Sequence, residues 1–144
     1  MGQTSFIHSN NGVLFAEGVS LESIAKQFST PTYIYSKNTL IQTFESFKKG
    51  LLKTDHLICF AVKSNSNIAI LNLFAGLGAG FDIVSGGELE RVIFAGGDPQ
   101  KIVFSGVGKT ESEIAAALKA NILCFNVESR SELMRIQGVA EKIN

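Results

Sequence analysis

One lysine stands where a nucleophilic amine could work. Lys63 comes directly after residues 57–62, a short apolar run that predicts a buried strand. In parallel α/β folds the carboxyl ends of the strands form the edge that carries the active site. Apolar surroundings there would remove water from the ammonium and favour the neutral amine, which can attack an aldehyde or carbonyl carbon and form an imine. The alternative is a lysine whose stem lies along apolar surface while its charge stays in water.

Two acids downstream fit this chemistry. Asp82 lies inside residues 81–85, a second strand-like run, where a carboxylate is costly unless it is paired. We expect it to pair with Lys63 or with a positively charged cofactor nitrogen, although an isolated structural ion pair stays open. Residues 85–88, Ser-Gly-Gly-Glu, open a helix whose free backbone N–H groups could hold an anion or could simply begin the helix. Glu88 could cap that helix or support Lys63.

Two glycine patterns resemble nucleotide-binding motifs but fail in detail. Residues 105–110, Ser-Gly-Val-Gly-Lys-Thr, look like the end of a P-loop, but Val103 stands where that motif requires glycine. Residues 76–80, Gly-Leu-Gly-Ala-Gly, suggest a dinucleotide fingerprint. There Phe81 replaces the last glycine, and the run precedes a strand instead of following one. We expect both patterns to be turns between strands and helices.

The elements that must position these residues alternate between short β-rich runs and longer helical ones. Predicted strands cover residues 57–62, 81–84, 102–104 and 123–127. Each is followed by a predicted helix, at residues 68–77, 87–95, 111–120 and 131–139. Residues 96–99, Gly-Gly-Asp-Pro, end the second helix, and Thr110 with Glu113 predicts a capping box at the start of the third.

This repetition, with strands apolar on both faces, predicts an α/β fold with a parallel sheet, in either a closed barrel or a doubly wound sheet. Because an eight-unit barrel needs about 250 residues, the four units visible here are either an unusual small α/β domain or, as we expect, a fragment of a longer protein. Upstream, residues 19–28 and 38–51 predict helices and residues 32–35 a strand. We expect residues 1–32 to be an N-terminal appendage and residues 33–144 to form the α/β domain.

Composition narrows the class of partner. The 144 residues carry 13 basic and 13 acidic side chains, so no net field would draw the chain to nucleic acid or to an anionic membrane. The apolar runs are too short or too polar to span a bilayer, and the start lacks a signal-peptide layout, so we expect a cytoplasmic location. Cys59 and Cys124 lie in apolar strand-like runs, where we expect reduced and packed cysteines. We predict no metal site.

Four blocks of sequence resemble one family. Residues 60–65, Phe-Ala-Val-Lys-Ser-Asn, resemble the pyridoxal-phosphate lysine motif of the barrel-type ornithine, arginine and diaminopimelate decarboxylases. Residues 80–91 and 104–110 look like the diaminopimelate branch of that family, and residues 125–129, Phe-Asn-Val-Glu-Ser, add a fourth block. Four ordered blocks make a far more specific match than any single short pattern.

The resemblance implies a pyridoxal 5'-phosphate enzyme with a TIM-like (β/α)8 barrel, of which residues 33–144 would form the N-terminal portion, truncated before barrel closure. It also assigns roles to three residues. Lys63 would form the Schiff base with the cofactor, and Asp82 and Glu88 would lie near the lysine and the cofactor. The implied reaction is decarboxylation of meso-2,6-diaminopimelate, a small amino acid, to L-lysine and carbon dioxide, the last step of lysine biosynthesis, with the cofactor as electron sink.

The same resemblance implies parts that this sequence does not contain. The stacking histidine, the glycine-rich phosphate loop, the glutamate partner of the pyridine nitrogen and the C-terminal substrate residues of the family would lie beyond residue 144. The full-length form would be a homodimer, with a C-terminal β-domain against which residues 1–32 would pack.

Other interpretations stay open on the sequence alone. The substrate could be ornithine or arginine, which turnover of the three amino acids by the full-length protein would decide. The chain could belong to a non-catalytic pyridoxal-phosphate-binding homologue that keeps the barrel and Lys63. It could also be a freestanding α/β binding domain in which Lys63 and Asp82 form only an ion pair. Such a domain would stay colourless with the cofactor.

Overall fold

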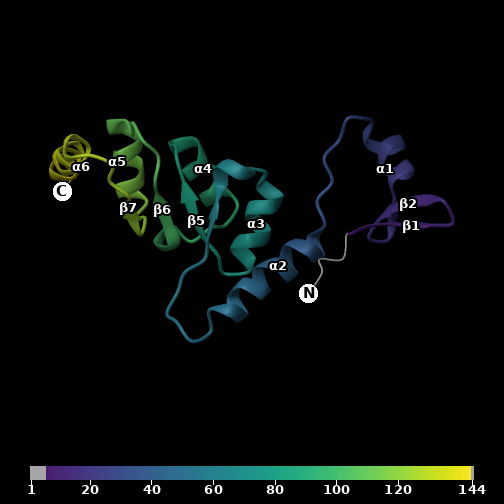
Figure 1. Cartoon of the computed structure of the whole chain (residues 1–144). Helices are drawn as coiled ribbons and strands as arrows, with labels where there is room; N and C mark the ends of the chain where they lie inside the picture. Colours follow the sequence, from purple (N-terminus) through teal and green to yellow (C-terminus); the bar gives the residue numbers. More distant parts are fainter. Residues whose placement is uncertain (1–5, 144) are drawn as a thin grey trace. The chain divides into compact units, whose positions relative to one another are not determined.

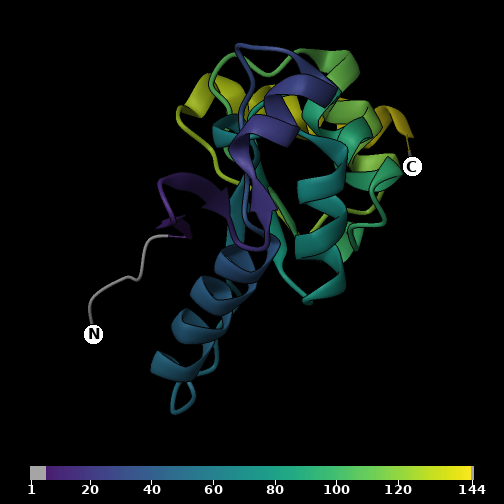
Figure 2. The same cartoon turned by 90° about the vertical axis from the view of Figure 1, so that its right-hand side faces the viewer.

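The computed structural model describes residues 6–143, which fall into two compact units divided after Thr54 (Figure 1). The first unit contains a small antiparallel sheet and two helices. Its strands pair in the order β1 (Ile7–Asn10), β2 (Val13–Ala16) and β3 (Val19–Ser20). Its helices are α1 (Leu21–Phe28) and α2 (Lys37–Gly50), the latter drawn as the long blue helix in Figure 2.

The β1–β2 hairpin was not expected from the sequence, although a local signal for it exists. Asn10 pairs with Val13, so Asn11 and Gly12 form a two-residue loop. Their φ angles are 49° and 80°, which is the left-handed backbone that Asn-Gly provides in tight hairpins. Because β1 is exposed along its whole length, burial leaves no alternating apolar pattern there, and the turn was the signal to read.

The segment between the two helices of this unit differs from prediction. Residues 32–35 are irregular backbone, so the strand predicted there is wrong. Tyr33 is 90% exposed and Tyr35 is 55% exposed, and side chains that favour strands gain little where nothing packs against them. The helix that follows is confirmed as α2. Its N-cap Ser36 donates its hydroxyl to the Glu17 carboxylate, which ties the start of α2 to the end of the hairpin.

The second unit contains four strands, each followed by a helix. The strands are β4 (Cys59–Ala61), β5 (Gly80–Ile83), β6 (Ile102–Phe104) and β7 (Cys124–Phe125). The helices are α3 (Ile68–Gly76), α4 (Gly86–Phe94), α5 (Glu111–Lys119) and α6 (Arg130–Ile143), with short 3-10 turns at Val62–Ser64 and Pro99–Lys101. Each strand and helix predicted for this region is present, although β4 is shorter than the predicted residues 57–62 and β7 is shorter than the predicted residues 123–127. The capping box at Thr110 is present as well.

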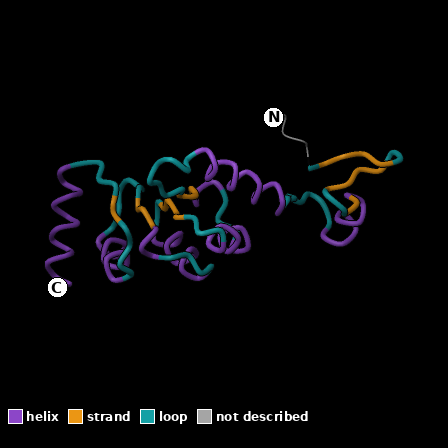
Figure 3. Tube along the Cα trace, turned by 90° about the horizontal axis from the view of Figure 1, so that it is seen from below, coloured by secondary structure: helices purple, strands orange, loops and turns teal. Residues whose placement is uncertain are grey.

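The order of the strands decides between the two sheet architectures. All neighbouring pairs are parallel and follow one another in the order β4-β5-β6-β7. Right-handed crossovers between successive strands then place all the helices on one face, whereas a doubly wound sheet has helices on both. Figure 3 shows the helices of this unit on one side of the strands. The arrangement is therefore part of a (β/α)8 barrel, as predicted.

The two faces of this sheet differ in burial. On the helix side, four strand residues have an exposed fraction of 0%: Phe81, Ile83, Ile102 and Phe104. Asp82 is in register with Val103, and Val103 with Cys124, so these three alternate residues share the opposite face. Asp82 and Val103 are half-buried and Cys124 is exposed. We call this the open face, and in a closed barrel it would line the interior.

Candidate functional site

Lys63 lies at the carboxyl end of β4, inside the 3-10 turn Val62–Ser64. The polar residues that follow it build this turn. The Ser64 hydroxyl donates back to the last carbonyl of β4 at 2.7 Å, and the Asn65 side-chain oxygen accepts the backbone N–H of Asn67 at 3.0 Å. Asn67 in turn caps α3. The segment after the lysine is thus a rigid support for the Lys63 backbone.

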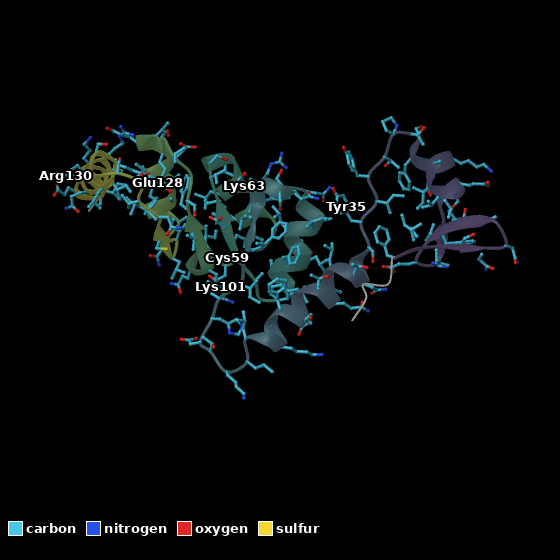
Figure 4. All side chains as sticks on the ribbon, in the orientation of Figure 1. Tyr35, Cys59, Lys63, Lys101, Glu128 and Arg130 are labelled. Carbon is cyan, nitrogen blue, oxygen red and sulfur yellow. The ribbon has the colours of Figure 1, made fainter. Side chains whose placement is uncertain are left out.

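The environment of the Lys63 side chain differs from the sequence expectation. Its place at the carboxyl edge agrees with prediction, and Figure 4 shows Lys63 and Glu128 toward this edge and Lys101 toward the other. The side chain is exposed, however, because β4 is an end strand of the sheet and the open face carries no second layer. The apolar surroundings expected for its ammonium are therefore wrong for this chain alone. Within residues 6–143 it forms no ion pair with Asp82, which also contradicts the purely structural pairing.

Asp82 carries an unsatisfied carboxylate oxygen on the neighbouring strand. It is in register with Ala61, so it lies on the open face two residues before the level of Lys63. Across the described part of the chain, its Oδ1 is the buried side-chain oxygen or nitrogen left without a hydrogen-bond partner. Such an atom costs free energy unless a donor reaches it. Asp82 is therefore poised to accept a hydrogen bond from a group that enters over the open face.

The start of α4 does not offer the free anion site that Ser85-Gly86-Gly87-Glu88 suggested. The Glu88 carboxylate accepts the backbone N–H of Val84 at 2.7 Å, and the Ser85 hydroxyl accepts that of Glu88 at 3.3 Å. Ser85 thus caps the helix, whereas Glu88 fixes the backbone just before the cap, and among residues 6–143 the structure gives no contact between Glu88 and Lys63. The Gly86 N–H donates to the Glu113 carboxylate at 2.8 Å. A second carboxylate occupies the place that an anion would need.

Glu113 joins two neighbouring turns at the carboxyl edge. Besides Gly86, it accepts the backbone N–H of Thr110 at 3.0 Å and the Thr110 hydroxyl at 2.8 Å. These bonds hold the pKa of Glu113 below its usual range, with the Gly86 N–H as the largest cause. The sequence identified Glu113 as a helix cap. Its reach to the preceding βα unit could not be read from spacing, because it depends on how the units pack.

Lys109, which ends the pattern that resembled a P-loop, is buried in an ion pair. Its side chain is 0% exposed, and its Nζ lies 2.5 Å from Glu132 Oε1. Glu132 also accepts the backbone N–H of Glu128 at 2.8 Å. The hydrogen bonds from Lys109 and Glu128, in that order, lower the pKa of Glu132. Sequence reasoning rejected the nucleotide motif correctly but did not identify this pair.

The two cysteines lie toward the open face and are free. Burial raises the pKa of the Cys59 thiol, and the nearby Asp82 carboxylate and Cys124 raise it further, so this thiol is held in its protonated form. Cys124 is exposed, and its predicted packing is wrong because no layer covers its side of β7. Residues 6–143 contain no cluster of potential metal ligands, and no helix among them has the length and apolar character needed to cross a bilayer.

Comparison with known proteins agrees with this architecture. The sequence pattern of the family described as "Pyridoxal-dependent decarboxylase, pyridoxal binding domain" matches residues 37–144. Diaminopimelate decarboxylase of Pseudomonas fluorescens is 56% identical over 133 residues, which are 92% of this chain and 32% of that protein. The corresponding enzyme of Vibrio cholerae is 54% identical over 138 residues, 96% of this chain and 33% of its own length.

Solved structures show the same fold. A crystal structure from Aquifex aeolicus superposes with a TM-score of 0.92 at 48% identity, covering 96% of this chain and 34% of that one. Diaminopimelate decarboxylase from M. jannaschii, solved with L-lysine, gives 0.89 at 36% identity, covering 95% and 33%. The chain thus spans about a third of the length of its relatives. With a family pattern that covers most of its residues, this chain belongs to the pyridoxal-dependent decarboxylases, through their pyridoxal binding domain.

Proposed function

We propose that the protein carrying this chain is a pyridoxal 5'-phosphate-dependent carboxy-lyase that converts meso-2,6-diaminopimelate to L-lysine and carbon dioxide, with Lys63 as the cofactor lysine. The observation that carries this proposal is that the accessible amine of Lys63, at the end of β4, and the unsatisfied carboxylate oxygen of Asp82 lie on neighbouring strands. The relatives named diaminopimelate decarboxylase, 54–56% identical, favour that substrate over other amino acids.

The residues present fit pyridoxal phosphate on two counts. Lys63 offers an exposed primary amine to an aldehyde, and Asp82 offers a buried acceptor that lacks a donor. Just before each of α4, α5 and α6, a glutamate of the first helical turn accepts one backbone N–H, so that N–H is not free for the phosphate group. The family resemblance implies that the main phosphate contacts come from the part of the protein beyond residue 144. When bound, the cofactor supplies the electron sink for the charge left on the substrate carbon as carbon dioxide departs.

The residues of this chain position that chemistry. The Lys63 amine would hold the cofactor through its aldehyde group and would also be placed to act as a base close to the reacting carbon. Asp82 accepts a hydrogen bond on the open face and favours a positive charge in that place. Glu88 would lie near the cofactor as the family resemblance implies, and it fixes the backbone of the β5–α4 turn through the N–H of Val84. Closure of the barrel would remove water from Lys63 and strengthen each of these interactions.

The whole protein is proposed to be a cytoplasmic homodimer. Residues 1–32 then pack with a C-terminal β-domain, as the family resemblance implies, and residues 33–144 form the first part of the barrel. Exposed apolar side chains on β2 and β3, including Leu14 at 51% and Val19 at 52%, support a covering partner for the small sheet. Sedimentation of the full-length protein should give twice the monomer mass.

Borohydride reduction tests the cofactor lysine. The full-length protein is incubated with pyridoxal phosphate, reduced, digested and analysed by mass spectrometry. We expect the cofactor on the peptide that contains Lys63, loss of the adduct in Lys63→Ala, and an unchanged adduct in Lys101→Ala, which removes a lysine at the opposite edge. An adduct on a different lysine would refute the assignment.

Turnover tests the substrate. Diaminopimelate, ornithine and arginine are compared at equal concentration by carbon dioxide release. We expect release from diaminopimelate with L-lysine as the product. Faster release from ornithine or arginine would replace the substrate but keep the role of Lys63, whereas cofactor binding without release from any of the three would indicate a non-catalytic homologue.

A further inference from the structure

The buried ion pair between Lys109 and Glu132 has no part in the reaction just described. Lys109 Nζ donates to Glu132 Oε1 at 2.5 Å and to the backbone carbonyl of Asn126 at 2.9 Å, and it lies 5.4 Å from the centroid of the Phe104 ring. Three partners of different kinds thus surround one ammonium that is fully shielded from water. The charge is satisfied on every side that the structure describes.

The contacts of this pair converge on one stretch of backbone, the turn that follows β7. Lys109 binds the carbonyl of Asn126, and Glu132 binds the N–H of Glu128. The Ser129 hydroxyl accepts the N–H of Glu132, which closes the start of α6. We call residues 126–129 the rim turn. Two charged side chains therefore hold the rim turn: Lys109 donates to one of its carbonyl groups, and Glu132 accepts one of its N–H groups.

The rim turn carries a polar pair toward the open face. The Asn126 side-chain N–H donates to the Ser105 hydroxyl at 2.9 Å. Both residues continue the ladder beyond the strand ends, because Ser105 N–H donates to Ile83 and Asn126 N–H donates to Phe104. By strand alternation, they lie two residues beyond Val103 and Cys124, on the face that Asp82 also occupies. The Ser105–Asn126 pair thus forms a polar layer nearer the carboxyl edge than Asp82.

An ion pair is a poor device for stability alone. Burying two charges costs much of what their attraction returns, and apolar residues of similar volume often serve as well or better. The two charges instead contribute directional hydrogen bonds, each of which fixes one backbone atom of the rim turn. The exposed pair Lys142–Glu111, at 3.6 Å between α6 and α5, shows the contrast. It holds no backbone group in the structure.

We propose that Lys109 and Glu132 are positioning residues, which fix the rim turn so that Ser105 and Asn126 form part of the wall of the ligand site. The contact with ligand rests on the proposed function of the open face, whereas the fixing of the turn stands on geometry alone. In this arrangement the lysine of the P-loop-like pattern binds the carboxyl end of the next strand instead of a phosphate. The hydroxyl and amide would then contact the polar groups of a bound pyridoxal phosphate or amino acid.

The test replaces both charges together, since a single replacement could unfold the protein. The full-length double variant Lys109→Met/Glu132→Leu is compared with the parent and with the control Lys142→Met/Glu111→Leu. Amide hydrogen exchange followed by mass spectrometry reports on the rim turn. We expect exchange in the peptide that contains Glu128 to speed up by roughly tenfold or more, as for the loss of a hydrogen bond to a charged acceptor. Peptides of β4 and β5 should be unchanged.

Cofactor binding supplies the second readout. Pyridoxal phosphate is titrated by fluorescence, and the Kd of the double variant is expected to rise by roughly tenfold, the effect of removing a supporting contact around a bound group. Ser105→Ala, which removes the polar pair but leaves the ion pair intact, should also raise the Kd while exchange at Glu128 stays at the parent rate. The control variant should match the parent in both measurements.

The outcomes separate the two parts. Unchanged exchange at Glu128 in a folded double variant would overturn the positioning role, and an unchanged Kd in both variants would overturn the contact with ligand. If the parent itself binds no cofactor, the proposed function fails, while the exchange rates still decide the role of the ion pair.

Discussion

Replacing Asp82 by valine should stabilise the cofactor-free protein and weaken cofactor binding. The Oδ1 atom is buried without a partner, which costs about 1–3 kcal/mol for a typical buried polar group. Valine removes that atom, suits a strand, and would lie beside Ala61 and Val103, its register neighbours. Because Asp82 is only half-buried, its second oxygen keeps contact with water. We therefore expect the lower part of the range, a gain of about 1–2 kcal/mol.

Urea denaturation of the cofactor-free full-length protein measures this gain. With an unchanged m-value, a gain of this size moves the midpoint by about 0.5–1 M for a slope near 2 kcal/mol/M. Asp55→Asn serves as the control, because Asp55 is exposed and its replacement should stay within about 0.5 kcal/mol. In the same preparation, Asp82→Val should raise the Kd for pyridoxal phosphate.

One result would refute the reasoning. If Asp82→Val destabilises the cofactor-free protein by more than about 1 kcal/mol while the m-value is unchanged, the carboxylate has a partner in solution. A double-mutant cycle with Lys63→Met then tests whether Lys63 is that partner. A coupling energy clearly different from zero would identify Lys63, and a coupling energy near zero would exclude it.

Three further predictions concern the scaffold. A Cβ on Gly106 would lie 2.2 Å from the Val84 carbonyl oxygen, so Gly106→Ala should cost about 3 kcal/mol or more in urea denaturation, whereas Gly87→Ala, with open space around it on α4, should be neutral or stabilising. Lys109→Met leaves Glu132 buried without its cation and should lower the free energy of unfolding by about 3–5 kcal/mol. Lys142→Met, which replaces a side chain that is 71% exposed, should lower it by less than about 1 kcal/mol, and equal effects would contradict the burial argument. The pKa values of Glu113 and Glu132 are both lowered in the folded protein. The stability that these two carboxylates contribute is therefore complete above the unfolded-state pKa of about 4.3 and is lost as pH falls through the folded pKa values. Glu132→Gln should flatten the acid limb of a plot of unfolding midpoint against pH, and an identical acid limb would argue against this linkage.

The second unit could be predicted from the sequence because its signals are local. Apolar runs bounded by glycine and by capping residues fixed the strands and helices, and the Thr110–Glu113 box was correct to the residue. Parallel strands buried on the helix side leave long apolar runs, which are hard to confuse with loops. The strand predicted at residues 32–35 failed because aromatic residues favour strands only where a neighbour covers them.

The environment of the candidate site could not be predicted in the same way. The exposure of Lys63, the second bond of Glu113 to Gly86 and the burial of Lys109 all depend on which βα units lie side by side. Spacing along the chain says which turn carries a residue, but it does not say which turn the residue reaches. The order of motifs therefore predicted correctly which edge of the sheet carries these residues, but it did not predict which groups they bind there.

The side-chain ties between βα units reach from one unit to the next. Asn72 on α3 donates to the carbonyl of Ala95 after α4, Glu113 reaches back one turn, and Lys109 reaches forward one turn. A chain of such links behaves like a row of adjoining repeats, in which each member is stabilised by its two neighbours. A disturbance in one member should accordingly fade within one or two positions along the row, and the two end members, β4 and β7 with their helices, should fray first because each has one such neighbour.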